Sequence, residues 1–233
     1  MFPLLSVFRR RIASPSFILQ VLNRLPKGKV IDVGCGDGQF LNSAKQLGWS
    51  TLGIEMDPEA VRVVRASGHD VIQGSYEALA DFDNKIDCVV CSHVLEHVHD
   101  PKSLLLAISR ALKVGGTALI SLPNAGSVVL HTLRENWRGL EAPRHLAIPT
   151  FEGALNLTRT LGFETEATFV SKLETLDESL AIAQFRGADR HEVAKQVALL
   201  KDWSGRVMET NSDFINLVLK KTGTRYELPV VRG

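Results

Sequence analysis

A short apolar strand that runs directly into closely spaced glycines is the feature that most constrains this chain. Residues 29–33 read Lys-Val-Ile-Asp-Val, a β-branched run typical of a buried strand. Glycines follow at positions 34, 36 and 38, and residues 40–47 then place apolar side chains on one face of a helix. Glycine lets the backbone turn sharply and lets a ligand approach without a Cβ in the way. Because a helix N-terminus behind such a turn attracts a carboxylate or a phosphate, the pattern predicts a nucleotide-type binding site.

The spacing of these glycines separates two classes of nucleotide site. A dinucleotide fingerprint needs its third glycine at position 39, where this chain has Gln39. The third glycine stands instead at position 38, and Asp32 lies near the end of the strand. This arrangement resembles motif I of the class I S-adenosylmethionine-dependent methyltransferases.

Three further segments follow in the order and spacing of that family. A second strand, residues 51–55, ends in Glu55, whose carboxylate can accept hydrogen bonds from both ribose hydroxyls. Residues 87–98 resemble the fourth strand and its exit loop in one large branch of the family. Residues 137–146 resemble a segment of members that are encoded with bacterial surface-polysaccharide genes. The resemblance covers roughly residues 28–170.

Strands and helices alternate along the chain at a spacing that favours a doubly wound, mostly parallel sheet. Asp-Pro pairs at 57–58 and 100–101 open two of the helices, and the second of these helices is expected to end at Gly115 and Gly116. Thr150 is expected to cap a later helix. Strands are expected at 30–33, 51–55, 70–73, 86–91, 117–122 and 163–170.

The resemblance implies a Rossmann-like α/β fold with seven strands, the last one antiparallel and preceded by a helical insertion. Apolar residues at 193–200 and 214–219 suggest helices in that insertion, and residues 226–231 are expected to form the final strand. Residues 126–149 lack periodicity and are expected to form a loop over the site. The expected segments are an N-terminal helical segment at 1–26, the cofactor-binding core at 27–170, a helical insertion or cap at 171–222, and the last strand at 223–233.

Composition excludes several other classes of protein. The 233 residues have a formal net charge of +1 and no basic stripe, so nucleic acid is not an expected partner. Three cysteines, an odd number at or beside predicted strands, favour free thiols and a reducing, cytoplasmic location. No apolar run reaches about 18 residues, so no transmembrane helix is expected. Residues 1–11, apolar and then basic, suit either a weak membrane-surface anchor or a helix that covers the cofactor.

For S-adenosylmethionine, the resemblance implies a set of contacts around the glycine loop. Asp32 anchors the loop or meets the amino group of the cofactor, Glu55 takes the ribose, and Met56 packs on the adenine face. Relatives commonly have Asp where this chain has Ser75, so the adenine amine is left to Ser75 or to a backbone carbonyl. The full expected set is Asp32, Gly34, Cys35, Gly36, Gly38, Glu55, Met56, Ser75, Tyr76, Ser92 and His93.

Residues 93–97 have the His-x-x-Glu-His spacing of one metalloprotease helix, but here they follow a strand in a cofactor-binding frame, which disfavours a peptidase. Some quinone-biosynthesis relatives have Glu at the position of His93 and are thought to bind a divalent cation nearby. Because this chain has His93 there, no metal is assigned. His97 is a candidate catalytic residue, with the alternative that Glu96 and His97 form hydrogen bonds that order the loop beside the methyl group.

The acceptor side of the expected site lies in the segment 137–146. Arg144 and His145 suit capture of a phosphate or carboxylate and deprotonation of a hydroxyl. Alternatively, Arg144 pairs with Glu141 or Glu135 and only fixes the loop. Trp137 either stacks on a sugar or plugs the loop against the core.

The chain is therefore identified as a member of the S-adenosylmethionine-dependent methyltransferases, with a small-molecule acceptor such as a sugar or saccharide hydroxyl. One alternative is methylation of a quinone-type phenol on oxygen. Another is a non-catalytic cofactor-binding protein of the same fold. A nicotinamide-dependent oxidoreductase is the third, and the glycine spacing disfavours it.

Overall fold

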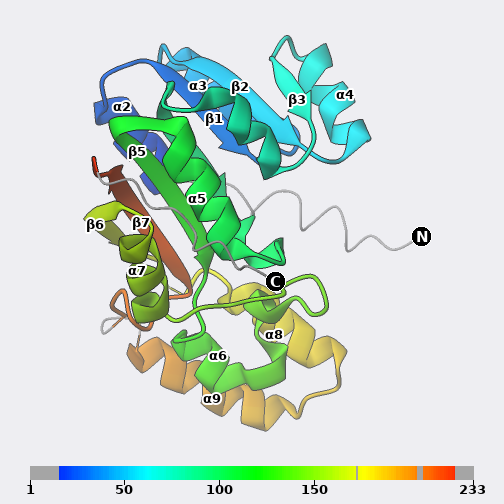
Figure 1. The fold of residues 1–233 in the computed structure, drawn as a ribbon. Coiled ribbons are helices and arrows are strands. Elements are labelled where there is room, and N and C mark those ends of the chain that lie inside the picture. The colour runs from blue at the N-terminus through cyan, green and yellow to red at the C-terminus, as the bar shows by residue number, and fades with distance from the viewer. Residues whose placement is uncertain (1–15, 172, 204–206, 224–233) are drawn as a thin grey trace, which may run out of the picture.

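The computed structural model describes residues 16–171, 173–203 and 207–223. Within these ranges a seven-stranded sheet has the order β3-β2-β1-β4-β5-β7-β6 (Figure 1). Strand β7 runs antiparallel to both of its neighbours, whereas the other pairs are parallel, which confirms the expected α/β sheet. The strands are β1 Lys29–Val33, β2 Ser50–Glu55, β3 Val71–Gln73, β4 Ile86–Ser92, β5 Leu112–Pro123, β6 Phe163–Val170 and β7 Phe214–Lys221.

The helix starts that the sequence predicts are present, and each has a side-chain cap. Asp57 accepts a hydrogen bond from the Glu59 amide at 2.9 Å, and Thr150 accepts one from the Gly153 amide at 3.1 Å. Asp100 caps its helix in the same way. A helix cap depends on residues within one turn, so a few neighbouring residues are enough to predict these helix starts. The α-helices are α2 Ser16–Arg24, α3 Gln39–Gln46, α4 Pro58–Ala66, α5 Pro101–Ala111, α6 Val128–Leu133, α7 Phe151–Thr160, α8 Leu176–Phe185 and α9 Arg190–Trp203.

The end of α5 differs from the prediction. The helix stops at Ala111, and Leu112 already has extended backbone angles and pairs with Ile86 of β4. Gly115 and Gly116 therefore lie inside β5 and do not end the helix. A pairing partner 26 residues away decides this boundary, and a helical apolar pattern cannot register such a partner.

The last strand is also placed differently. Residues 214–219, expected to be helical, form β7, and residues 226–231 lie outside the described ranges. Strand β7 is sandwiched between β5 and β6 and is buried along most of its length. A strand buried on both faces is a continuous apolar run, and such a run is not distinguished from a short helix by periodicity.

Helices cover both faces of the sheet. The larger core packs α5 and α7 against side chains such as Ile120, Leu122 and Leu217. The opposite face is covered by α2 and α3 through Ile18, Leu22 and Ala44. The α2 helix lies within the expected N-terminal helical segment, whereas residues 1–15, with the proposed surface anchor, are outside the described ranges.

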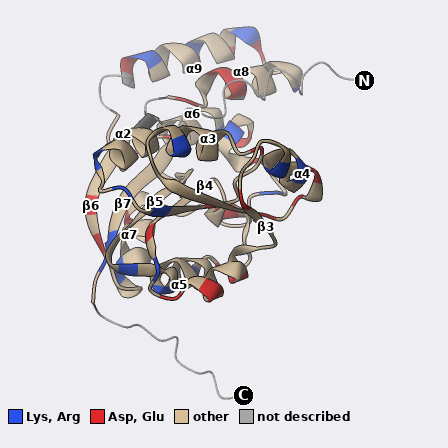
Figure 2. Ribbon diagram, turned by 90° about the horizontal axis from the view of Figure 1, so that it is seen from above, with Lys and Arg blue, Asp and Glu red and all other residues tan. Residues whose placement is uncertain are grey.

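A small helical cap stands at one end of the sheet, built from α6, α8 and α9 (Figure 1). Residues 126–149, expected to be a loop, contain α6 and the short 3-10 helices η3 Arg134–Asn136 and η4 Arg138–Leu140. The further 3-10 helices are η1 Tyr76–Phe82 and η2 Leu95–His97. Helix α9 forms an outer edge of the cap with both acidic and basic residues (Figure 2). Among the described residues, no helix has the length and apolarity required to cross a bilayer.

A buried carboxylate ties the two cap insertions together. Asp213, fully buried just before β7, accepts hydrogen bonds from the Ser127 hydroxyl at 2.6 Å and from the Thr175 amide at 2.8 Å. Burial raises the pKa of Asp213 above its usual value, and the hydrogen bonds from Ser127 and Thr175 offset only part of this increase. Ser127 begins α6 and Thr175 precedes α8, so one side chain holds both insertions against the sheet.

Candidate active site

The glycine loop after β1 has positive φ angles at all three glycines, in keeping with the sharp turn that the sequence predicts. Gly34, Gly36 and Gly38 have φ angles of 73°, 54° and 81°. A Cβ on Gly34 would lie 2.6 Å from a methyl group of Val94, whereas a Cβ on Gly36 would meet no atom within 4 Å. The space in front of Gly36 is therefore open to a ligand, and the loop backbone forms its floor.

Glu55 lies directly against this loop. Its Oε2 accepts a hydrogen bond from the Gly36 amide at 2.9 Å. Its Oε1 accepts from the amides of Met56 and Asp57 at 2.7 and 2.9 Å. Both lone pairs of Oε1 are engaged by these two amides, whereas Oε2 keeps one, so Glu55 can still accept from a ribose hydroxyl at Oε2. The carboxylate therefore shapes the loop as well as offering an acceptor atom.

Asp32 is a buried carboxyl beneath the loop. Burial, together with the nearby charge of Glu55, raises the pKa of Asp32 to about 8. A cationic ligand group placed beside it would favour its ionised form, which fits the amino group of S-adenosylmethionine. Cys35, by contrast, packs inward against Leu41 and Val64, and burial raises the pKa of its thiol to about 12. Only the backbone of Cys35 is therefore placed at the ligand space.

The other expected cofactor residues surround the same end of the sheet. Met56 has 69% of its surface exposed, so its side chain is accessible beside Glu55. Ser75 and Tyr76 start η1, next to a turn in which the Gly74 amide donates to the Glu55 carbonyl at 2.9 Å. Ser92 ends β4 and is half-buried.

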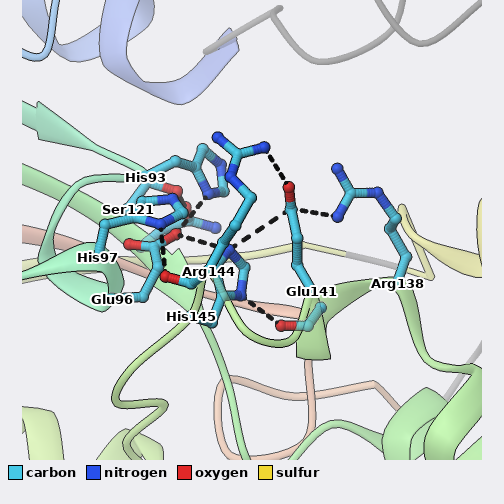
Figure 3. A network of polar contacts seen from close by, with 10 residues as sticks. His93, Glu96, His97, Ser121, Arg138, Glu141, Arg144 and His145 are labelled. Carbon is cyan, nitrogen blue, oxygen red and sulfur yellow. Dashed lines mark hydrogen bonds and ion pairs between the residues drawn. The ribbon is translucent and has the colours of Figure 1, made fainter. Parts of the chain in front are cut away.

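A polar cluster lies where β4 ends, with Glu96 at its centre (Figure 3). The Glu96 side chain is fully buried, and its Oε1 accepts a hydrogen bond from His93 Nδ1 at 3.2 Å. The His93 amide also donates to the carbonyl of Ser121 at 2.8 Å. Within the described part of the chain, the other oxygen of Glu96 has no hydrogen-bond partner. A buried acceptor without a donor is costly, so this oxygen favours binding of a cation or of a hydrogen-bond donor of a ligand.

Two histidines present a free lone pair next to this carboxylate. His97 Nδ1 lies 3.0 Å from the Arg144 carbonyl, and His145 Nδ1 lies 2.6 Å from the Gly139 carbonyl. A carbonyl only accepts, so each Nδ1 must carry the proton, and each neutral ring keeps its lone pair on Nε2. The two rings pack edge to face with centroids 4.7 Å apart.

His145 is the less accessible of the pair. Its side chain is 6% exposed, and Nε2 lies 4.0 Å from Glu96 Oε1 and 3.6 Å from Glu141 Oε2. Burial lowers the pKa of His145 more than these carboxylates raise it. At pH 7 the ring is therefore neutral, and the carboxylates of Glu96 and Glu141 lie close enough to stabilise a proton that the ring accepts.

The structure shows how the side chains of Arg144 and Trp137 are placed in the segment 137–146. Arg144 pairs with Glu141 at 2.6 Å and is largely exposed, and Glu141 also pairs with Arg138 (Figure 3). Trp137 is 1% exposed, and its Nε1 donates to the Thr175 hydroxyl at 3.0 Å. Trp137 therefore plugs the loop into the cap and is not available for stacking on a sugar.

Glu96 and His97 both form hydrogen bonds within the loop, as in the alternative that they order it. Glu96 accepts from His93, three residues earlier, and His97 contacts the backbone carbonyl of Arg144, 47 residues further on. The amide of Leu146 donates to the Glu96 carbonyl at 2.7 Å, which closes the segment over the cluster. No local spacing signals the contacts with Arg144 and Leu146, because they depend on how the loop after α6 folds back.

The donor set of the cluster is suitable for a divalent cation. Glu96, His97 and His145 each offer a ligand atom, and these atoms lie within 4.8 Å of one another. Both Nδ1 atoms are held by carbonyls, an arrangement that orients metal-binding imidazoles in many proteins. The same atoms also suit proton transfer, and the assignment of no metal stays a prediction.

The comparisons with known proteins identify the family of the chain. The family profile described as methyltransferase domain matches residues 8–168. Ubiquinone biosynthesis O-methyltransferase from Xanthomonas oryzae is 35% identical over 107 residues, 43% of this chain and 45% of that protein. The enzyme of the same name from Erwinia tasmaniensis is 37% identical over 118 residues, 48% of this chain and 49% of that protein.

Solved structures show the same fold. A methyltransferase from Archaeoglobus fulgidus, described as S-adenosylmethionine-dependent, has a TM-score of 0.66 at 19% identity and covers 94% of this chain and 100% of its own. The cyclopropane synthase MmaA2 from Mycobacterium tuberculosis has a TM-score of 0.59 at 17% identity, covering 88% and 84%. The chain therefore belongs to the methyltransferase domain family, within the class I S-adenosylmethionine-dependent methyltransferases.

These comparisons also set limits on the acceptor. The chain spans about half the length of the curated relatives it matches. Their names refer to ubiquinone biosynthesis and give no support to a sugar acceptor. The open space at Gly36, the acceptor atom of Glu55 and the buried Asp32 fit S-adenosylmethionine, the cofactor of the family.

Proposed function

We propose that this protein transfers the methyl group of S-adenosylmethionine to a phenol-type oxygen of a small molecule. The observation that supports this most is the polar cluster next to the cofactor loop, where two imidazoles with Nδ1 held by carbonyls and a buried carboxylate converge. The names of the curated relatives favour the same acceptor over a sugar hydroxyl. A cytoplasmic location remains a prediction, and the three cysteines are free buried thiols.

The acidity of the acceptor supports a phenol. A phenol has a pKa of about 10, within reach of an imidazole base, whereas an aliphatic sugar hydroxyl is far less acidic. The bound cofactor supplies an electrophilic methyl group on a sulfonium. The protein must hold the acceptor oxygen in line with that methyl group and remove the phenolic proton.

His97 is the proposed proton acceptor. Its Nδ1–H is fixed by the Arg144 carbonyl, so Nε2 can take the phenolic proton as the oxygen–methyl bond forms and the sulfur–methyl bond breaks. His145, packed against the His97 ring, is proposed as a positioning residue. Glu141 fixes Arg138 and Arg144, which keeps both carbonyl contacts of the loop in place.

The test is a methyl-transfer assay with the full chain. Catechol and caffeic acid are compared with methyl glucoside and UDP-glucose, and S-adenosylhomocysteine release is measured. Turnover of the phenols, lost in His97→Ala and kept in the exposed-site control His131→Ala, is the expected result. Turnover of the sugars alone would overturn the phenol assignment. Tight cofactor binding without turnover of any acceptor would favour the non-catalytic alternative.

A further inference from the structure

We propose that an apolar cavity behind the polar cluster binds an alkyl chain carried by the methyl acceptor, an inference that rests on the proposed function. The cavity has a volume of about 370 Å³ and lies between α5 and α7, over the sheet. Its walls include Leu105 of α5, Leu157 of α7, Leu122 of β5 and Leu217 of β7. The proposal adds a second subsite to the one that holds the reacting oxygen.

The chemistry of the walls selects a hydrocarbon. Among the residues that line the cavity, Thr158 has the one hydroxyl, and it already donates to the Leu155 carbonyl at 3.1 Å. The remaining lining side chains are aliphatic. A sugar, a phosphate or a peptide would lose its hydrogen bonds to water there without replacement, at a cost of several kcal/mol. An alkyl group has no such bonds to lose.

The size of the cavity argues for a ligand and against a packing defect. Protein interiors are close-packed and contain few voids larger than a water molecule. An apolar cavity of about 150 Å³ holds one benzene ring, so this cavity has room for roughly a dozen carbon atoms. Its volume also falls within the range of small-molecule sites, about 300–1,000 Å³.

The position of the cavity connects it with the reacting centre. Leu95 lines the cavity, and the next residue is Glu96 of the polar cluster. Ala147, two residues after His145, lines it as well. The amides of Leu146 and Ala147 lie 2.7 and 3.4 Å from the Glu96 carbonyl, so the cavity wall and the cluster are built from the same two segments. An acceptor with its oxygen at His97 would direct an attached chain toward this space.

The experiment compares catechol with 4-dodecylcatechol in the wild type and in a filled-cavity variant. Ala154→Phe places a ring in the cavity, because Ala154 is 4% exposed and lines it. Glu152→Phe, at an exposed position of the same helix, is the matched control. The wild type and the control are expected to show a KM for 4-dodecylcatechol at least about tenfold below that for catechol. Ala154→Phe is expected to lose this preference and to keep catechol turnover.

Two additions keep the outcomes distinct. Ala154→Leu, a smaller filling, covers the case that the phenylalanine variant does not fold, and thermal unfolding checks both. Calorimetry with decan-1-ol measures the cavity without methyl transfer. Binding of decanol, abolished by filling, with no phenol turnover would reject the proposed function alone. Catechol turnover with no effect of chain length and no decanol binding would overturn the alkyl-chain subsite alone.

Discussion

The amide of Gly36 donates to Oε2 of Glu55 at 2.9 Å, and this contact joins the loop after β1 to the end of β2. The second oxygen of Glu55 accepts two amides at the start of α4. One carboxylate therefore fixes two backbone segments beside the ligand space, the loop after β1 and the residues before α4. The proposed ribose contact and the shape of the loop involve the same side chain.

Replacement of Gly36 tests the ligand space directly. Gly36→Val is expected to lower the affinity for S-adenosylmethionine at least about 100-fold, because the side chain would fill the open space while the left-handed backbone adds strain. Gly68→Val is the matched control, since Gly68 also has a positive φ and open space but lies beyond α4. Calorimetry measures both, and unchanged affinity in Gly36→Val would refute the loop assignment.

Asp32 predicts a particular dependence of stability on pH. The folded chain raises the pKa of Asp32 from 3.8 to about 8, so the folded state holds this proton more tightly than the unfolded state. The contribution of Asp32 to the free energy of unfolding therefore falls as pH rises from about 4 to about 8, and then levels off. Asp32→Asn is expected to flatten this decline in urea unfolding of the cofactor-free protein between pH 5 and 8.5.

The exposed Asp70 supplies the control for that experiment. Asp70→Asn is expected to leave the pH profile of the wild type unchanged. An equal slope in the wild type and Asp32→Asn would mean that the Asp32 carboxyl is not desolvated in the free protein.

Replacement of His97 or His145 is expected to lower turnover without changing cofactor affinity. His97→Ala is expected to lower kcat about 100- to 10,000-fold, the usual contribution of a positioned base. His145→Ala is expected to lower kcat by a smaller factor, because the His97 ring loses its neighbour but keeps its carbonyl contact. The affinity for S-adenosylhomocysteine should stay constant in both. Full activity of His97→Ala with the preferred acceptor would exclude it as the base.

Trp137 predicts a stability effect that is centred on the cap. Trp137→Ala removes a fully buried ring and its bond to Thr175, so a loss of about 3–5 kcal/mol in the free energy of unfolding is expected. Trp137→Phe should lose about 1 kcal/mol, the usual net value of one hydrogen bond. Equilibrium urea unfolding measures both, and a wild-type stability in Trp137→Ala would place the ring outside the packed cap.

Local signals explain which parts of the fold were predictable from the sequence. The glycine loop, the Asp-Pro helix starts and the Thr150 cap each act within a few residues, and each is present as predicted. The start of β5 and the whole of β7 are decided by strands far away in the chain. Strand β7 is buried along most of its length and is largely apolar, so its pattern alone could not separate strand from helix.

The candidate site also has a part that was predictable from the sequence and a part that was not. The residues of the glycine loop and Glu55 were predictable because they belong to one βαβ unit with a known spacing. The contacts of His97 with the Arg144 carbonyl and of the Glu96 carbonyl with the Leu146 amide required the segment after α6 to fold back over the end of β4. The sequence indicated His97, Arg144 and His145 as site residues. It did not indicate that each histidine would contact a backbone carbonyl through Nδ1.

Both cap insertions are hydrogen-bonded to Asp213, and this connection affects how the acceptor preference of such a protein can change. The donor half is built from residues 29–76, whereas the two cap segments, 126–149 and 171–213, are both hydrogen-bonded through the buried carboxylate of Asp213, among other contacts with the sheet. New acceptor preferences can therefore arise by exchange of these two segments as a set, with the donor half left untouched. In the laboratory, a chimera that transplants both segments with Asp213 is a more promising design than one that transplants either alone.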